Sequence, residues 1–283
     1  MTLACIESVR ASIHALRKSV SVKIIVVDNG SSPSLAKNTP ELALSEDVTL
    51  VRSADNLGFA GGMNLGIQRA QQGPVDAVWL LNNDTLVDRE ALPALVNFKK
   101  EHPDKTLVGS VMTGSVNGTS ITICGYTYYK YLGVARPVHP RGSGCDQLPS
   151  FLKPRIDYID GAAMFIDMAQ LKAVGGLPTE NFLYYEELNL THALGGYRRV
   201  GICQAAKVMH AGGASTAAMD SSKRIYFSSL AAFRYTEHHA ALGLPLVMLL
   251  RLITALTRDI RTRSLKHTSA VVKALIDSVK RDC

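Results

Sequence analysis

Cysteine is scarce in this sequence, and no two cysteines stand at a spacing typical of a metal site. None of them forms a C-x-x-C pair, and their number is odd (Cys5, Cys124, Cys145, Cys203 and Cys283). A disulfide framework needs paired cysteines, and a zinc knuckle needs closely spaced ones. The sequence therefore excludes a small disulfide-stapled fold, and we expect a chain that works in the reducing cytoplasm.

The main apolar run near the end of the chain is too short to cross a bilayer by itself. The apolar segment at residues 241–250 reaches Arg251 after ten residues, about half of the roughly 20 that a spanning helix needs. At the start of the chain, residues 1–18 have apolar side chains at helical spacing. We therefore expect an amphipathic helix there, with Thr2 as its N-cap, and no signal peptide.

Acidic residues are few in the last part of the chain. From Arg251 onward, eight Lys and Arg stand against three Asp, so this segment holds five of the seven net positive charges. The segment has no interleaved aromatic residues and no nucleic-acid motif, so we expect no nucleic acid partner. An apolar stretch followed by a basic helix is typical of a peripheral segment on an anionic membrane. A helix packed on the core with a solvated basic face fits the same pattern.

Short apolar runs alternate with helical patterns through the first half of the chain. Strands are predicted at residues 23–28, 48–53, 77–81 and 106–112, and helices after Gly61 and after Asp88. This alternation indicates an α/β fold whose sheet has helices on both faces, with ligands beyond the carboxyl ends of the strands. Residues 114–154 are rich in Gly, Tyr and Pro, and we expect a loop excursion there. The 47% apolar composition is sufficient for a full core.

Polar residues follow two of the predicted strands in the first 70 residues. Asp28 and Asn29 end one strand in VVDNGSS, where the carboxylate could accept hydrogen bonds from a ribose or a base, or only stabilise the turn. The segment NLGFAGGMNLG contains Asn56, Gly61 and Gly62 and leads into a helix. Free backbone N–H groups at such a turn suit a diphosphate, although the glycine spacing is not that of a dinucleotide fold.

Three further motifs contain candidate metal ligands or catalytic residues. Asn82, Asn83 and Asp84 follow the strand AVWLL, and oxygen donors of this kind suit Mg²⁺ or Mn²⁺. Glu186 and Glu187 lie together in YYEELNL, either as a catalytic carboxylate pair or as partners of a helix dipole. His210 ends the apolar run of VMHAGGAST, where a structural role and a ligand role are both open.

Taken in order, six segments resemble the family 2 glycosyltransferases of the GT-A fold, with the nearest likeness to the rhamnosyltransferase-like branch of bacterial surface polysaccharide synthesis. The segments are VVDNGSS, NLGFAGGMNLGI, WLLNNDT, DGAAMFIDMAQLKAVGG, FLYYEELNL and VMHAGGAST. The resemblance extends over residues 2–216. It implies a nucleotide-sugar-binding, Rossmann-like mixed sheet in residues 1–216 and a helical C-terminal extension in residues 217–283.

The resemblance also implies roles for particular residues. A donor nucleotide sugar would lie against Asp28, Asn29, Asn56, Gly61, Gly62, Asn82 and Asn83. A divalent Mg or Mn ion would be held by Asp84, with His210 as a second ligand. The acceptor side would include Gly161 and Tyr185. Glu187 would be the catalytic base, and Glu186 would orient the loop or an acceptor hydroxyl.

These roles predict an inverting, metal-dependent glycosyltransferase of the cell envelope. The implied donor is a dTDP- or UDP-sugar, with rhamnose as one candidate sugar, and the implied acceptor is a saccharide or a lipid-linked saccharide at the inner face of the plasma membrane. A second reading is a catalytically silent homologue that serves as a binding or assembly subunit.

One departure concerns the first strand of the family, which precedes the first helix. Met1 falls directly at the start of that helix, so the first strand of the fold is expected to be missing. Three explanations are open: the true start lies upstream, the chain is a truncated copy, or another segment fills the gap. Because that strand lies inside the sheet, its absence would leave neighbouring strand edges unpaired and the chain poorly stable.

Overall fold

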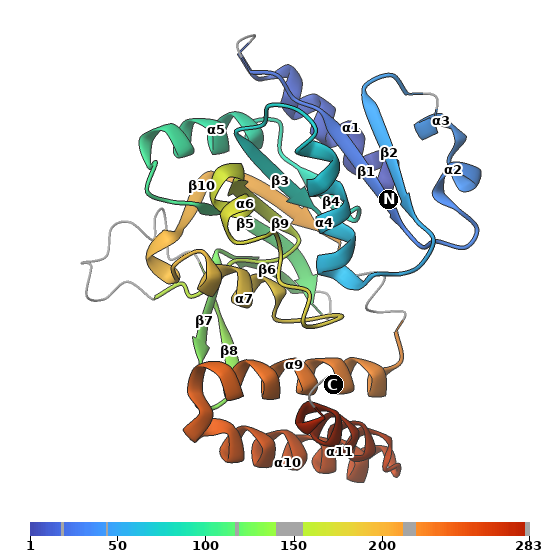
Figure 1. Cartoon of the computed structure of the whole chain (residues 1–283), viewed down its shortest axis with the longest axis vertical. Helices are drawn as coiled ribbons and strands as arrows, with labels where there is room; N and C mark the ends of the chain where they lie inside the picture. The colour runs from blue at the N-terminus through green and yellow to red at the C-terminus, as the bar shows by residue number, and fades with distance from the viewer. Residues whose placement is uncertain (18–19, 44, 117–118, 140–154, 212–218, 281–283) are drawn as a thin grey trace.

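The computed structural model describes residues 1–17, 20–43, 45–116, 119–139, 155–211 and 219–280, and it has an α/β domain above a layer of helices (Figure 1). The larger sheet runs in the order β3-β9-β5-β10-β4, and β6 pairs with β5. Only β5 and β10 run parallel in it, so the sheet is mixed. Its strands are β3 (Ala77–Leu81), β4 (Thr85–Val87), β5 (Leu107–Val116), β6 (Thr119–Ile123), β9 (Ala163–Asp167) and β10 (Val200–His210).

A second sheet consists of β1 (Ile24–Asn29) and β2 (Val48–Ser53), which pair in parallel. Within the described ranges, no strand pairing joins this sheet to the larger one. β1 and β3 are therefore both edge strands, each with one side of its backbone outside a strand ladder.

Helices pack on both faces of the larger sheet, as the sequence predicts. On one face, α4 (Gly58–Ala70), α6 (Met168–Ala173) and α7 (Glu186–Ala193) bury apolar side chains that include Ile67, Leu171 and Leu190. On the other face, α1 (Thr2–His14) and α5 (Ala91–Glu101) do the same with Ile13 and Leu95. The short helices α2 (Leu35–Asn38) and α3 (Pro40–Ala43) connect β1 to β2, and η2 (Tyr197–Arg199) precedes β10.

The four predicted strands and the three predicted helices are all present, but two details of the sequence prediction are wrong. The expected loop at residues 114–154 contains the end of β5, then β6, β7 (Gly125–Tyr129) and β8 (Val134–Val138). Their β-branched and aromatic residues favour strands despite the nearby glycines. Thr2 is the first residue of α1 and makes no cap, because Met1 occupies the N-cap position.

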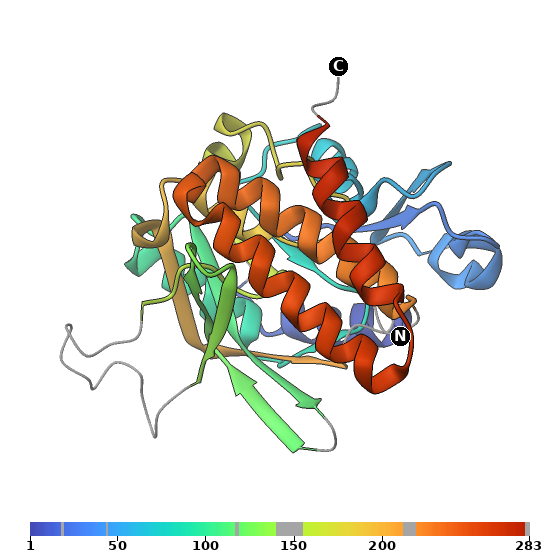
Figure 2. The same ribbon diagram turned by 90° about the horizontal axis from the view of Figure 1, so that it is seen from below.

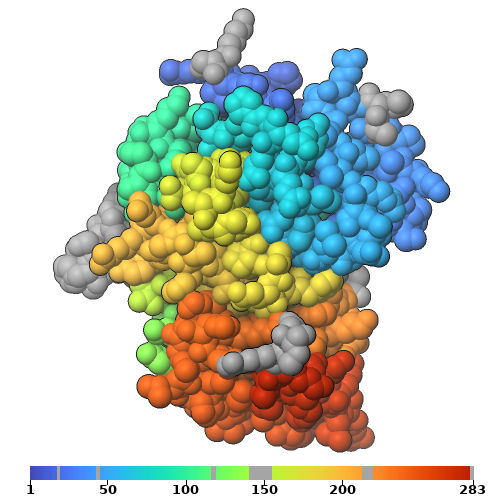
Figure 3. Space-filling view, viewed as in Figure 1, coloured from blue at the N-terminus to red at the C-terminus, as the bar shows by residue number. Residues whose placement is uncertain are grey.

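The layer below the domain is formed by α9 (Ser221–Ala240), the turn η3 (Ala241–Gly243), α10 (Leu244–Thr262) and α11 (Lys266–Val279). Figure 3 shows this layer from orange to red, directly under the α/β domain. The three helices share a core with Phe233, Val247 and Val271 at its centre. By length and composition alone, Ser221–Thr262 contains a window apolar enough to cross a membrane. The predicted domain boundary at 216/217 lies outside the described residues, which omit 212–218.

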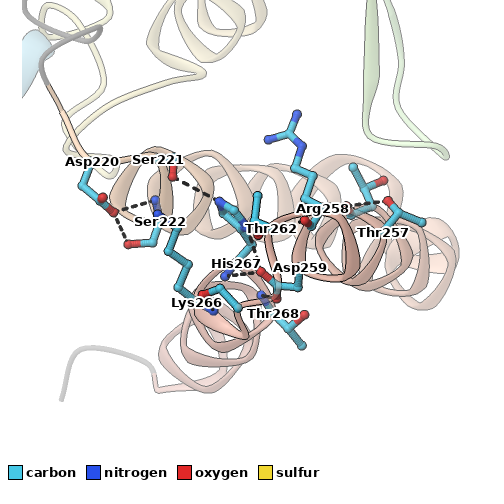
Figure 4. Close-up of polar contacts among 12 residues, drawn as sticks. Asp220, Ser221, Ser222, Thr257, Arg258, Asp259, Thr262, Lys266, His267 and Thr268 are labelled. Atoms are coloured by element: carbon cyan, nitrogen blue, oxygen red, sulfur yellow. Dashed lines mark hydrogen bonds and ion pairs between the residues drawn. The ribbon is translucent and has the colours of Figure 1, made fainter.

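Polar side chains tie the ends of these three helices together (Figure 4). The Asp259 carboxylate accepts hydrogen bonds from the backbone N–H groups of His267 (3.1 Å) and Thr268 (2.7 Å), so it caps the start of α11. The same carboxylate lies 2.8 Å from Nδ1 of His267, whose Nε2 is 3.1 Å from Oγ of Ser221. Asp259 and His267 are both buried. This chain of contacts fixes α10 and α11 against the start of α9.

Candidate active site

Asp84 and His210 lie side by side at the carboxyl end of the larger sheet. The antiparallel pairing of β4 with β10 sets His210 opposite Thr85, the residue after Asp84. Nε2 of His210 is 3.2 Å from Oδ1 of Asp84. The sequence separates these residues by more than 120 positions, and the strand register brings them together.

The pair fits a divalent cation. Asp84 is 9% exposed, and the buried Nε2 of His210 has no hydrogen-bond partner among the described residues, although the carboxylate is close. A nitrogen and a carboxylate oxygen directed at one point are a common metal-ligand combination. The described part of the chain has no group of three or more His, Cys, Asp or Glu around one such point.

The two asparagines before Asp84 have different surroundings. The backbone N–H of Asn82 donates to the carbonyl of Ala162 (3.0 Å), which joins the end of β3 to the segment before β9. The exposed Asn83 donates through Nδ2 to Oγ1 of Thr2 (3.0 Å) in α1. The backbone of Asn82 is therefore tied to the segment before β9, whereas the Asn83 amide is directed toward the first helix.

Glu187 lies beside Gly161, one residue before Ala162. A methyl group added at Gly161 would stand 3.8 Å from Oε2 of Glu187 and 3.7 Å from the ring of Phe59. The missing side chain therefore leaves room in front of the carboxylate. The residue after Gly161, Ala162, accepts a backbone hydrogen bond from Asn82, which lies two residues before Asp84.

Burial raises the pKa of both Glu186 and Glu187. For Glu187, the negative charges of Glu186 and Asp160 raise the pKa further. Glu186 is buried, and its Oε1 has no hydrogen-bond partner in the described ranges. Two adjacent carboxyl groups enclosed in this way are expected to hold a proton at a pH where an exposed glutamate has lost it, which is typical of acid–base sites.

The backbone is strained just before the two glutamates. Tyr184 and Tyr185 both have left-handed conformations, with φ of 77° and 71°. Such conformations cost roughly 1–3 kcal/mol for a residue other than glycine and persist where the surroundings enforce them. The Tyr185 hydroxyl accepts from Tyr128 (3.2 Å) and from Arg251 of α10 (3.3 Å). The helical layer thus helps to hold the segment that presents the glutamates.

Asp160 and Tyr126 belong to the same site, although the sequence does not predict them there. The Tyr126 hydroxyl donates to Oδ2 of Asp160 (3.1 Å), and Oδ1 of Asp160 accepts from the N–H of Ala162 (2.9 Å). The rings of Tyr126 and Tyr158 stack 4.9 Å apart. The DGAAMF motif contains the aspartate, but its tyrosine partner lies in the stretch that was expected to be a loop.

A pocket of about 560 Å³ opens near this site between the β7–β8 hairpin, the second half of α7 and α9. Leu188, the residue after Glu187, is part of its wall. Aromatic and polar side chains form much of the remainder, including Tyr128, Arg155, Asp157, His192, Tyr197 and Tyr235. Such a lining can stack on sugar rings and bond to hydroxyl groups.

Asp28 is already engaged by the protein. Its carboxylate accepts from the N–H groups of Ser31 (3.0 Å) and Leu35 (2.9 Å) and from Arg52 (2.9 Å). Burial alone would raise the pKa of Asp28, but these hydrogen bonds hold it at about 2. The structure therefore favours the turn-stabilising role of Asp28, with Arg52 as a half-exposed cation at the end of β2.

The glycine-rich segment differs from the expected diphosphate cradle. Gly61 and Gly62 lie inside α4, which begins at Gly58. The N–H groups of Leu57, Gly58 and Phe59 donate to Asn29 (2.9 Å), to Asn56 (3.0 Å) and to the carbonyl of Phe182 (3.1 Å) respectively. The prediction of free donors at this turn is wrong for these three groups, because two asparagine side chains cap the helix from outside.

Gly62 instead allows helix α4 to approach the end of β1 closely. A methyl group there would be 2.8 Å from Nδ2 of Asn29, so only glycine lets α4 pack on the end of β1. Asn29 also donates to Oδ1 of Asn56 (3.2 Å). Asn29, Asn56 and Gly62 therefore hold the start of α4 against the end of β1.

Comparison with known proteins agrees with this architecture. Residues 1–141 match the family described as Glycosyl transferase family 2. The Low-salt glycan biosynthesis hexosyltransferase Agl10 of Haloferax volcanii is 24% identical over 214 residues, which are 74% of this chain and 66% of that protein. The chain thus spans slightly less than two thirds of this relative's length.

Solved structures share the fold at low identity. S. aureus TarS 1-349 in complex with UDP-GlcNAc has a TM-score of 0.60 and 15% identity, over 99% of this chain and 77% of that one. Mannosyltransferase PcManGT from Pyrobaculum calidifontis, in complex with GDP-Man and Mn²⁺, has a TM-score of 0.53 and 14% identity, over 100% and 85%. GalNAc-T7 with UDP, GalNAc and Mn²⁺ has a TM-score of 0.57 and 14% identity, over 74% of this chain and 41% of that one.

Proposed function

We propose that the protein transfers a sugar from a nucleotide-diphosphate donor to an acceptor hydroxyl, because residues 1–141 match the Glycosyl transferase family 2 model and the fold is of the GT-A type. One observation carries this proposal. The Asp84–His210 pair and the Glu187 carboxylate stand on one sheet edge, connected by the hydrogen bond from Asn82 to Ala162. A cation-binding pair and a base placed in this way serve the two ends of one displacement reaction.

Glu187 is the base in this proposal. Its carboxylate takes the proton of the acceptor hydroxyl while that oxygen forms a bond to the anomeric carbon. The bond from this carbon to the diphosphate breaks, and the diphosphate leaves with the electron pair. Attack opposite the leaving group inverts the anomeric configuration. The raised pKa of Glu187 makes it a stronger base than an exposed glutamate once it is deprotonated.

Asp84 and His210 would hold a divalent cation at the diphosphate. Such a cation supplies positive charge where the leaving group becomes more negative. The glycosyltransferase structures that contain Mn²⁺ with UDP or GDP-Man support Mn²⁺ as the first ion to test, with Mg²⁺ as the alternative. Asn82 stands next to this point and is placed to bond to the donor.

The acceptor is assigned to the side of Gly161, Tyr185 and the aromatic pocket. The open space in front of Gly161 admits a hydroxyl to Glu187, while Glu186, buried behind, keeps the pKa of its neighbour high. The aromatic lining of the pocket suits a saccharide. A lipid-linked saccharide is the acceptor class that best fits the basic, apolar helical layer, which also suggests peripheral attachment at the inner face of the plasma membrane.

Only the resemblance to other glycosyltransferases limits the choice of nucleotide and sugar in the donor. The six segments shared with the rhamnosyltransferase-like branch support rhamnose on dTDP as one donor, and a role in cell-envelope polysaccharide synthesis. The neighbour that binds UDP-GlcNAc supports a UDP-sugar as another. The nucleoside would lie over the ends of β1 and β2, near Asp28 and Arg52.

The test is a turnover assay of the purified chain with Mn²⁺ and a panel of dTDP-, UDP- and GDP-sugars, in which release of the nucleoside diphosphate is measured. Release that depends on Asp84 and on Glu187 supports the proposal. Tight binding of a nucleotide sugar with no release from any donor would favour the alternative, a catalytically silent homologue that acts as a binding or assembly subunit.

A further inference from the structure

The helix α10 has a continuous apolar row on its exposed side. Leucine and isoleucine side chains, each at least 43% exposed, recur at spacings of three and four residues from the preceding turn to the last turn of the helix. At 100° per residue these positions fall on one face. The row consists of Leu242, Leu246, Leu249, Ile253, Leu256 and Ile260.

This row lies opposite the side of α10 that holds the domain. Arg251 donates from α10 to Ser228 of α9 (3.1 Å), to the Tyr185 hydroxyl (3.3 Å) and to the carbonyl of Gly133 (3.4 Å). By helical angle, Arg251 stands about 180° from the centre of the row. The apolar row therefore faces away from the active site. Figure 2 views the helical layer from below, with the ribbons of α10 and α11 in front.

The neighbouring helix α11 continues the same surface and adds charge. It exposes an apolar row of its own, which consists of Leu265, Val272, Ile276 and Val279. Lys266, Lys273 and Lys280 follow at intervals of seven residues, so they form a parallel line beside that row. Between residues 252 and 280 every exposed ionisable side chain is basic, because Asp259 is buried and Asp277 is half-buried.

The tip of the β7–β8 hairpin adjoins the start of α10. Gly133 and Gly243 are close-packed against Val247 and Tyr131, respectively, where a methyl group would approach to 2.7 and 2.8 Å. Beside these contacts Tyr131 and Leu132 remain 51% and 42% exposed. The same hairpin forms one wall of the 560 Å³ pocket near Glu187.

We propose that α10, α11 and the hairpin tip form one docking face for an anionic lipid bilayer, with the two apolar rows at the acyl boundary and the lysine line at the phosphates. Exposed apolar rows of this length are uncommon on soluble surfaces, and the predominantly basic border matches an anionic headgroup layer. Docking through this face places the pocket beside the bilayer, where the saccharide of a lipid-linked acceptor emerges. The last point rests on the proposed function, whereas the docking itself does not.

The face is amphipathic and lies on the protein surface, which distinguishes docking from spanning. One side of α10 is built into the three-helix core through Val247 and Ala255, and Arg251 on that side is hydrogen-bonded to the domain. A spanning helix would need apolar side chains all round.

The experiment is sedimentation of the full chain with vesicles, either of neutral phosphatidylcholine or with about one third phosphatidylglycerol. We expect binding to the anionic vesicles that weakens as salt rises, because salt screens the attraction. The double variant Leu249→Glu/Ile253→Glu should lower the partition coefficient at least about 100-fold, because two buried anchors are lost. Val22→Glu, at an exposed apolar position outside the face, is the matched control and should bind as the wild type does.

Several outcomes would overturn the proposal. They are failure to bind anionic vesicles at low salt, equal binding by the double variant, resistance of the bound protein to extraction by high salt and alkali, and a concentration-dependent dimer that the double variant abolishes. The last two would indicate a spanning helix and a second copy of the chain as the occupant. Release of nucleoside diphosphate, measured on the same preparations without vesicles, reports the proposed function separately, and the double variant should retain it.

Discussion

Replacing Glu187 by glutamine tests the catalytic base most sharply, because the structure predicts opposite effects on activity and stability. Glutamine keeps the shape of the side chain beside Gly161 but cannot take a proton. A positioned base typically contributes about 10²- to 10⁴-fold to the rate. We therefore expect Glu187→Gln to lower kcat by that factor while donor affinity changes little.

The stability effect follows from proton linkage. Burial and the charges of Glu186 and Asp160 raise the pKa of Glu187 in the folded chain above its value in the unfolded chain. Between these two values the folded state binds more protons, so the free energy of unfolding falls as pH rises. The slope reaches at most about 1.4 kcal/mol per pH unit for one group. Wild-type activity should rise with pH through the same window in which wild-type stability declines.

The assays are a pH–rate profile and thermal melts from pH 5 to 8.5, with the melts recorded without donor or metal. Glu187→Gln should flatten the decline in melting temperature as well as lower kcat. Glu186→Gln is the matched control: it should keep most of kcat at high pH and move the acid limb of the profile to lower pH, because one charge that raises the pKa of Glu187 is removed. A Glu187→Gln protein with kcat within about threefold of wild type would refute the role of base.

Three other predictions concern the metal pair, the hydrogen bond to Asp160 and the packing of α4. Asp84→Ala and His210→Ala should each abolish most turnover and weaken Mn²⁺ binding in calorimetry while the melting temperature changes little, and full activity in EDTA would contradict a metal role. Tyr126→Phe removes the hydrogen bond to Asp160 (3.1 Å) and should lower kcat/KM with a smaller effect on stability, about 1 kcal/mol; unchanged kcat/KM would exclude Tyr126 and its bond from the mechanism. Gly58→Ala should destabilise the fold by about 2–4 kcal/mol, because φ is +75° and the added methyl would be 2.4 Å from the carbonyl of Phe182. The control Gly73→Ala meets no atom within 4 Å and should be nearly neutral in a denaturant titration, so equal losses in the two variants would show that the close approach at Gly58 is unimportant.

The elements that the sequence predicts correctly are those with a strong local pattern. The strand at residues 77–81 is a short apolar run that ends in polar residues, and the helix after Asp88 has a clear apolar face. The prediction of a loop after Gly114 is wrong, because the β-branched and aromatic residues of this stretch favour strands despite the glycines and prolines between them. Tyr126 was lost from the predicted site for the same reason.

Contacts set by strand register could not be read from local patterns. The proximity of His210 to Asp84 depends on the antiparallel pairing of β4 with β10, whereas the sequence motif by itself favours a structural histidine over a ligand. Likewise, the engagement of Asp28 with Arg52 depends on the parallel register of β1 and β2, which sets the two residues opposite each other. In both cases the sequence motif identifies a candidate residue, whereas the strand pairing determines which residue it contacts.

In the helical layer, the sequence does not predict which side chains face the solvent. Composition placed an apolar segment before a basic one, but it did not reveal which side chains face outward. Arg251 was counted among the basic residues of the tail, yet it is half-buried and hydrogen-bonded to Tyr185 beside the active site. Only the packing of α10 on α9 separates this inward arginine from the outward apolar row.

The central claim is transfer of a sugar at the edge that carries Asp84, His210 and Glu187. Its most direct test is the release of nucleoside diphosphate by the purified chain from a panel of dTDP-, UDP- and GDP-sugars, measured with EDTA and again after Mn²⁺ is restored. The account predicts release from at least one donor that stops in EDTA, returns with Mn²⁺ and is absent in Asp84→Ala. Binding of a nucleotide sugar without release from any donor, with Mn²⁺ present, would contradict it.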